Sequence, residues 1–176
     1  MTSTDGNPTT RILGIDPGLN VTGYGVVEFD GVRQVALVEA GVLRGGNSKK
    51  PLGTRLLALQ RGMADVIKAL QPNVVAMEEL YSHYERPRTA ILMGHARGVL
   101  CLAAAAADLT THHYSATQIK RVLTGNGRAP KSQIQAAIAT LLELSEPPEP
   151  PDVADALAIA VCHCFLSLPK TVAHTK

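Results

Sequence analysis

Acidic residues stand at three places in the sequence where packing alone would not put them. They are Asp16, Glu78, Glu79, Asp152 and Asp155. The first three come directly after short apolar runs, and the last two begin a long apolar segment. Clustered carboxylates repel one another, and their hard oxygen atoms favour Mg²⁺ or Mn²⁺ over zinc. Three or four such acids can hold two ions about 3.5–4 Å apart, an arrangement that suits phosphodiester hydrolysis.

Two buried strands are expected to end at Asp16 and at the pair Glu78 and Glu79. The apolar runs 12–15 and 74–77 do not alternate with polar residues, which is typical of strands buried on both faces. Adjacent strands lie about 4.8 Å apart, so neighbouring strands would bring Asp16 and one glutamate to a common ion. Only one of Glu78 and Glu79 can face that ion, because successive strand side chains point to opposite faces. The pattern does not choose between them.

Each acid also has an ordinary structural explanation. Asp16 precedes Pro17 and Gly18, and Asp is common at the first position of such a turn. Asp152 follows a proline-rich segment, and helix capping, which stabilises a helix by about 1 kcal/mol, is the simpler explanation for it. Asp155 lies on the same helix face and is harder to explain, because a run of apolar or small residues follows it.

The remaining segments predict an α/β fold. Residues 23–29 and 32–43 are expected to be antiparallel strands joined by a tight turn at Asp30-Gly31. A last strand is expected over residues 109–114, and helices over 52–70, 89–107, 116–123, 131–142 and from 152 onward. Residues 1–10 are expected to be a disordered leader, 11–167 a single domain and 168–176 a flexible tail.

Composition predicts a soluble globular protein with an aliphatic core. The chain has 176 residues, of which 45% are hydrophobic, 18% charged and 3% aromatic. The net charge of +2 is too small to indicate a partner, but residues 86–131 hold seven basic residues and one acidic residue. This basic middle segment is compatible with a polyanionic ligand, although a solvated face would look similar.

Cysteines and hydropathy favour a cytoplasmic protein. The three cysteines, Cys101, Cys162 and Cys164, suit a reducing compartment. The last two lie two residues apart, hence on different helix faces, and are not expected to share a metal ion. The N-terminus lacks the apolar core of a signal peptide, and no apolar run reaches the ~20 residues that span a bilayer.

Taken together, the motifs resemble the RuvC-type Holliday junction resolvases, crossover junction endodeoxyribonucleases of the RNase H-like superfamily. The matching residues are 14–18, 22–25, 76–78, Tyr81, 94–98, Lys120, 131–133 and 152–158. The resemblance covers about residues 11–166. It implies an RNase H-like nuclease domain with a five-stranded mixed sheet in the order 3-2-1-4-5, with strand 2 antiparallel and helices on its flanks.

The resemblance also implies roles for individual residues. The implied metal-binding and catalytic acids are Asp16, Glu78, Asp152 and Asp155, which selects Glu78 over Glu79. The implied DNA contacts are Tyr81, Arg86, Arg88, Lys120 and Lys131. Tyr81 stands where the family usually has Phe, and some members carry His at the position of Asp152. The small-residue helix over 94–107 is implied to be part of a dimer interface.

The implied reaction is Mg²⁺- or Mn²⁺-dependent nicking with two ions per active site. A homodimer would cut two strands of like polarity in a four-way DNA junction, leaving ligatable 5′-phosphate and 3′-hydroxyl ends. The family works with a RuvA–RuvB branch-migration complex. Two alternatives stay open: a non-catalytic junction-binding protein, and an actin-like ATPase, whose phosphate-binding segment resembles the turn at Asp16.

Overall fold

The computed structural model describes residues 9–79 and 87–168 and places five strands in one mixed sheet. The elements are β1 (Thr10–Asp16), β2 (Val21–Phe29), β3 (Val35–Arg44), α1 (Leu52–Leu70), β4 (Val74–Glu78), α2 (Pro87–Ala105), β5 (Thr111–Tyr114), α3 (Ala116–Thr124), α4 (Lys131–Leu141) and α5 (Pro151–Leu166). The strand order is β3-β2-β1-β4-β5. β2 runs antiparallel to both neighbours, and β4 runs parallel to β1 and β5. The expected sheet is confirmed.

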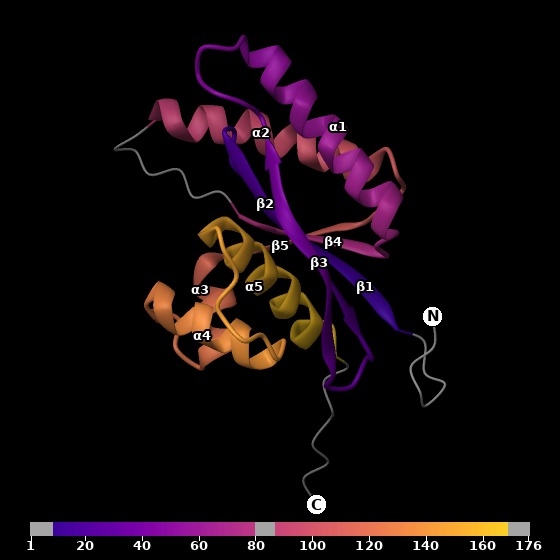
Figure 1. The fold of residues 1–176 in the computed structure, drawn as a ribbon, viewed down its shortest axis with the longest axis vertical. Coiled ribbons are helices and arrows are strands. Elements are labelled where there is room, and N and C mark those ends of the chain that lie inside the picture. The colour runs from indigo at the N-terminus through magenta and orange to yellow at the C-terminus, as the bar shows by residue number, and fades with distance from the viewer. Residues whose placement is uncertain (1–8, 80–86, 169–176) are drawn as a thin grey trace, which may run out of the picture.

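Helices cover both faces of this sheet (Figure 1). α1 and α2 lie together on one face, while α3, α4 and α5 lie on the other. Each face buries its own cluster of side chains: Ile12, Val27, Val74 and Ala76 pack toward α5, and Leu13, Ile15, Val26, Val75 and Met77 pack toward α1 and α2. The central strands β1 and β4 are therefore buried on both faces, which explains why their sequences do not alternate.

α5 packs closely against the sheet. Its residues are buried without a break from Ala156 to Cys164. A Cβ atom at Gly14 of β1 would collide with the carbonyl oxygen of Ala156, and one at Gly23 of β2 would collide with the backbone of Asp152. Because both positions are glycine, the first turns of α5 can lie directly against the ends of β1 and β2.

The hairpin between β2 and β3 differs from the expected tight turn. β3 begins at Val35, three residues later than predicted. The carboxylate of Asp30 accepts hydrogen bonds from the backbone N–H groups of Val32, Arg33 and Gln34, at 2.8, 2.8 and 2.9 Å. These bonds hold the segment as a longer loop, so the two-residue turn was wrong.

The cysteines and the helices give no sign of disulfides or membrane spans in the described part of the chain. All three cysteines are free. Burial raises the pKa of the Cys162 and Cys164 thiols to about 12, so both behave as small apolar side chains. None of the described helices combines the length and the apolar character needed to cross a bilayer.

Candidate active site

Asp16 and Glu78 end two neighbouring parallel strands. The pairing of β1 with β4 stops at Ile15 and Met77, one residue before these two acids. Both acids are partly buried. The sheet therefore delivers two carboxylates to the same edge, one from each central strand.

Alternation along β4 places Glu78, not Glu79, on the side of α5. Ala76 packs in the cluster against α5, whereas Met77 packs against α1 and α2. Glu78 shares the face of Ala76. It lines a pocket together with Asp155, and Glu79 is exposed.

Asp152 and Asp155 reach this edge from the first turns of α5. The N-cap of α5 is Pro150, and the described residues provide no side-chain hydrogen bond that caps the helix. The capping explanation for Asp152 is therefore wrong, because Pro151 takes the first helical position, which its fixed φ suits. Asp152 lies in the first turn, where the helix dipole favours a negative charge. Asp155 lies three residues further, on the same side of the helix.

Neighbouring carboxylates perturb Asp16 and Glu78 electrostatically. Burial first, and then the negative charges of the other three acids, raise the pKa of Asp16 to about 7. Burial and the charge of Asp155 also raise the pKa of Glu78. The other three acids are thus close enough to Asp16 for their charges to disfavour its ionisation, as expected where carboxylates cluster.

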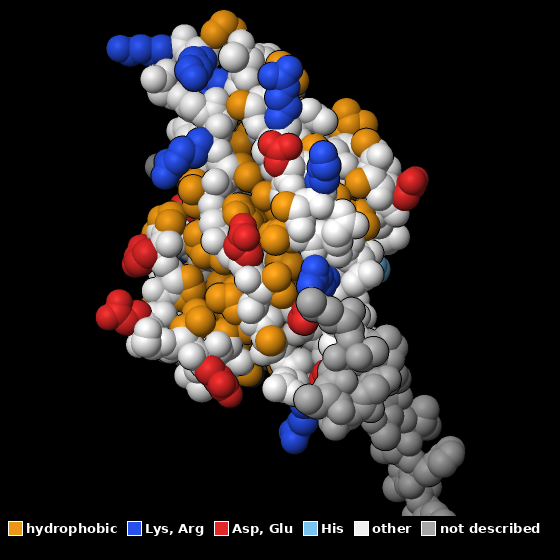
Figure 2. Space-filling model, turned by 45° about the vertical axis from the view of Figure 1, so that its right-hand side comes forward, with side chains coloured by type: hydrophobic (Ala, Val, Ile, Leu, Met, Phe, Trp, Pro, Cys, Tyr) orange, Lys and Arg blue, Asp and Glu red, His pale blue; other side chains and the backbone are white. Residues whose placement is uncertain are grey.

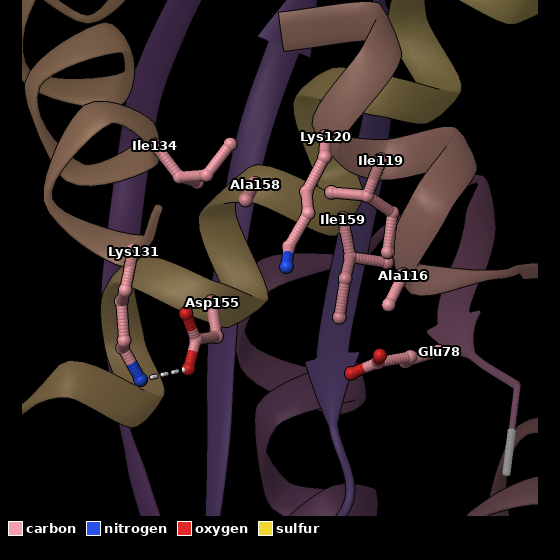
Figure 3. Close-up of a pocket in the computed structure, with 9 residues that line it drawn as sticks. All are labelled: Glu78, Ala116, Ile119, Lys120, Lys131, Ile134, Asp155, Ala158 and Ile159. Atoms are coloured by element: carbon pink, nitrogen blue, oxygen red, sulfur yellow. Dashed lines mark hydrogen bonds and ion pairs between the residues drawn. The ribbon is translucent and has the colours of Figure 1, made fainter. Parts of the chain in front are cut away.

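Two lysines line the pocket together with the acids (Figure 3). Lys131, at the start of α4, places its Nζ atom 2.6 Å from Oδ2 of Asp155, and this contact raises the pKa of the lysine. Lys120 of α3 extends toward the space between Asp155 and Glu78. Its side chain makes no hydrogen bond within the described residues. The positive charges of both lysines partly offset the rise in the pKa of Glu78, which stays above its ordinary value.

The pocket combines charged and apolar walls in a volume of about 260 Å³. Lys131 is paired with Asp155, Glu78 lies apart from this pair, and Lys120 points between the two acids. The apolar lining comes from Ala116, Ile119, Ile134, Ala158 and Ile159. An anionic group can lie near the lysines while a cation lies near the acids, which is the charge pattern that a phosphodiester with a metal ion requires.

The residues present fit a hard divalent cation. All four acids offer carboxylate oxygens, which Mg²⁺ and Mn²⁺ prefer. Across residues 9–79 and 87–168, no three His, Cys, Asp or Glu side chains already stand in a metal-binding arrangement, and Lys131 contacts one oxygen of Asp155. Burial and the charges of the other three acids raise the pKa of Asp16, and a divalent ion held among these acids would offset that rise.

The residues predicted to contact DNA do not all gather at the pocket. Lys120 and Lys131 line it. Arg88 lies on the first turn of α2 and is exposed. Tyr81 and Arg86 lie outside the described residues.

Two residues at the edge of the site were not assigned a role from the sequence. Thr22 is fully buried, and its hydroxyl donates to the carbonyl oxygen of Gly18 at 2.7 Å, which fixes the turn after Asp16. Arg97 of α2 donates a hydrogen bond to the backbone of Glu78. In the sequence, Thr22 is a polar residue within an apolar strand and Arg97 lies between small residues. Neither pattern indicates which group the side chain contacts.

Together, the sheet order and the acids at the ends of β1, β4 and the start of α5 define the class of RNase H-like nucleases. The match to a family model is more specific. The chain belongs to the family of crossover junction endodeoxyribonuclease RuvC, whose model matches residues 12–163.

Relatives with sequence and structural similarity agree with this assignment. A crossover junction endodeoxyribonuclease RuvC of Rhodopirellula baltica is 54% identical over 156 residues, covering 89% of this chain and 86% of the relative. One from Desulforamulus reducens is 47% identical over 152 residues, covering 86% and 91%.

Solved structures show the same fold. Thermus thermophilus RuvC in complex with a Holliday junction substrate has a TM-score of 0.84 and 31% identity, covering 89% of this chain and 94% of that one. The yeast mitochondrial Holliday junction resolvase Ydc2, at 16% identity and a TM-score of 0.64, shares the fold, with 90% and 79% coverage. Membership of the RuvC family overturns the actin-like ATPase alternative.

Proposed function

We propose that this protein is a structure-selective endonuclease that resolves four-way DNA junctions in recombination and DNA repair. It makes paired nicks in two strands of like polarity. The observation that carries this proposal is the convergence of four carboxylates beside a pocket with two lysines. The similarity to a RuvC solved with a Holliday junction substrate supports the choice of DNA structure.

Asp16, Glu78, Asp152 and Asp155 would hold the divalent metal, which is Mg²⁺ or Mn²⁺ with two ions per site. When bound, such ions activate water and stabilise the leaving oxygen of a phosphodiester. The rigid placement of the acids is the contribution of the chain. Asp16 and Glu78 lie at the ends of neighbouring strands, and the other two acids lie on a helix packed against those strands.

Lys120 and Lys131 would orient the phosphate that is cut. The side chain of Lys131 is 54% exposed, so its pair with Asp155 contributes only about 0–1 kcal/mol to stability. The ammonium group can therefore leave the carboxylate for a phosphate oxygen at low energetic cost. Lys120 already extends into the pocket. Cleavage in this orientation is proposed to leave 5′-phosphate and 3′-hydroxyl ends.

Further cations would hold the arms of the junction. The proposed contacts are Arg88 on α2 together with Tyr81 and Arg86. Figure 2 also shows Lys and Arg side chains over the upper part of one face, where α1 and the segment before it lie. Phosphate contacts position DNA without reading its sequence, so binding is expected to weaken as salt rises.

A homodimer would form through the exposed face of α2. Ile91 and Leu102 are 62% and 64% exposed there. Gly94 and Gly98 lie between them at helical spacing, and a Cβ atom on either would meet nothing within 4 Å in the described residues. An apolar face with a small-residue centre suits close contact between two identical helices. The resulting two-fold symmetry would match that of a four-way junction.

Family membership also supports a partner and a location. We expect the dimer to act with a RuvA–RuvB branch-migration complex in the cytoplasm.

The test is cleavage of a static and a mobile four-way junction, with a linear duplex of the same sequence as control. With Mg²⁺ or Mn²⁺, we expect symmetric nicks in both junctions, products that ligase seals, and no nicks in the duplex. Equal cutting of the duplex would indicate a general nuclease. Binding without nicks under both metals would indicate a non-catalytic junction-binding protein.

A further inference from the structure

The ladder between β1 and β4 alone does not fix the position of Glu78 relative to Asp16. The ladder between β1 and β4 ends one residue before both acids, at Ile15 and Met77. The residue after Asp16 is Pro17, which has no N–H group to extend that ladder. On its β5 side the end of β4 is held, because Glu78 pairs with Tyr114 and the N–H of Glu79 donates to the carbonyl oxygen of Tyr114 at 2.9 Å. On its β1 side, the carbonyl of Glu78 takes its partner from outside the sheet.

Arg97 of α2 provides that partner. Its Nε atom donates to the carbonyl oxygen of Glu78 at 3.3 Å, and its Nη2 atom donates to Nδ1 of His113 at 2.7 Å. A guanidinium group has only donors, so Nδ1 of His113 must be the acceptor and the imidazole is uncharged. His113 pairs with Met77 across the β4–β5 ladder. One planar side chain thus joins α2, β4 and β5 at the end of the strand that carries Glu78.

We propose that Arg97 is a positioning residue that directs the Glu78 carboxylate toward Asp16 and Asp155. Arg97 is not part of the pocket lining and contacts the backbone of Glu78, so it acts through that residue. The inference rests on the proposed function, because it assigns how one acid of that same site is held. The rigid fork of donors matters, since a lysine ammonium cannot reproduce its geometry.

The experiment compares Arg97→Met, Arg97→Lys and a control, Arg33→Met, which removes an exposed arginine from the loop between β2 and β3. Arg97→Met is expected to slow single-turnover cleavage of pre-bound junction by about 10- to 100-fold, because small misplacements of catalytic groups have effects of this size. Mn²⁺ affinity of the DNA-free protein is expected to fall several-fold, and junction affinity to stay within twofold. Arg97→Lys should recover part of the rate, and Arg33→Met should match wild type.

Two results would overturn the inference. A fall in junction affinity as large as the fall in rate, with a weaker salt dependence, would make Arg97 a phosphate contact. A lower melting temperature with unchanged rate and Mn²⁺ affinity would make Arg97 a packing residue only. If Arg97→Met does not fold, His113→Ala removes one arm of the same bridge and should lower rate and Mn²⁺ affinity by a smaller factor; no change in either would also contradict the inference.

Failure of this inference is separable from failure of the proposed function. If wild-type protein does not cut junctions, the proposed function fails. If wild type cuts and Arg97→Met cuts at the same rate, only the role of Arg97 fails.

Discussion

Glu78 and Glu79 have the same side chain, but the two side chains point to opposite faces of the sheet at the end of β4. Glu78 is partly buried on the α5 side, where burial and the charge of Asp155 raise its pKa. Glu79 is exposed on the opposite side, where its charge acts on His113. Chemistry at the site should therefore depend on the first and not on the second.

Exchange of each glutamate for glutamine tests this distinction. We expect Glu78→Gln to lower the junction cleavage rate by more than about 100-fold, because loss of groups that merely orient metal ligands already costs about 10- to 100-fold. Glu79→Gln is the matched control and should cut within twofold of wild type. Equal losses in single-turnover assays would mean that strand alternation does not select the catalytic acid.

Asp16 should make the stability of the metal-free protein depend on pH. Its pKa is raised from 3.8 to about 7 in the folded state, so the folded protein holds a proton that the unfolded chain releases between these values. The free energy of unfolding should therefore fall as pH rises from about 4 to 7 and then level off. The loss from this group is at most about 4 kcal/mol.

Asp16→Asn removes this penalty and should show it directly. In buffer with a chelator, we expect the variant to melt at a higher temperature than wild type at pH 8, and at a similar temperature at pH 4. Thermal unfolding at both values is the measurement. A variant that is less stable than wild type at pH 8 would contradict the electrostatic account of the cluster.

For individual residues, the sequence predicted which acids lie close together but not which contacts position them. Asp16 and Asp155 could be identified because a carboxylate beside a buried segment is costly. The choice between Glu78 and Glu79 could not be made from the residues, since both faces of β4 are buried and only the packing of Ala76 and Met77 distinguishes them. The contact of Arg97 with a backbone carbonyl leaves no pattern in a sequence.

At the scale of elements, the close packing of α5 on β1 and β2 sets the distance between the acids on the strands and the acids on the helix. The strand acids are Asp16 and Glu78, and the helix acids are Asp152 and Asp155. Gly14 and Gly23 make this packing possible. Any side chain at either position would push the helix outward, and Asp152 and Asp155 would move with it.

Gly14→Ala tests this dependence against Gly53→Ala. We expect Gly14→Ala to lower the free energy of unfolding by about 1–3 kcal/mol or more, because overpacking forces the backbone to shift, and to slow junction cleavage. Gly53 lies in α1, and a Cβ atom there meets nothing within 4 Å in the described residues. Its change to Ala should be neutral or stabilise by up to about 1 kcal/mol. Equal behaviour of the two variants in denaturant unfolding would refute the close-packing argument.

The long helix α1 could be predicted from its apolar period, whereas the starts of β3 and α5 could not be predicted from local sequence preferences. The apolar period of α1 gave residues 52–70, which agree with the structure. The start of β3 was wrong because one carboxylate, Asp30, captures three backbone N–H groups. The prediction that Asp152 caps α5 was wrong because Pro151 takes the first helical position. In both cases a local contact overrode the general preference.

For the whole molecule, paired nicking requires two active sites related by symmetry. The exposed face of α2 is the surface that would join them, and it belongs to the helix that also carries Arg97.

Leu102→Glu should prevent the proposed dimer from forming. A charge buried at a two-fold interface meets its own copy, so we expect a monomer in sedimentation experiments and single rather than paired nicks. Leu57→Glu is the control, because Leu57 is also exposed, at 47%, but lies on α1. A dimeric Leu102→Glu variant would place the interface elsewhere.

The most direct test of the central claim is the cleavage and binding of a static four-way junction by Asp16→Asn. If the acids bind metal while separate basic groups bind phosphate, the variant should bind the junction within about twofold of wild type and produce no nicks with Mg²⁺ or Mn²⁺. Cleavage at the wild-type rate would show that the carboxylates around Asp16 are not the active site.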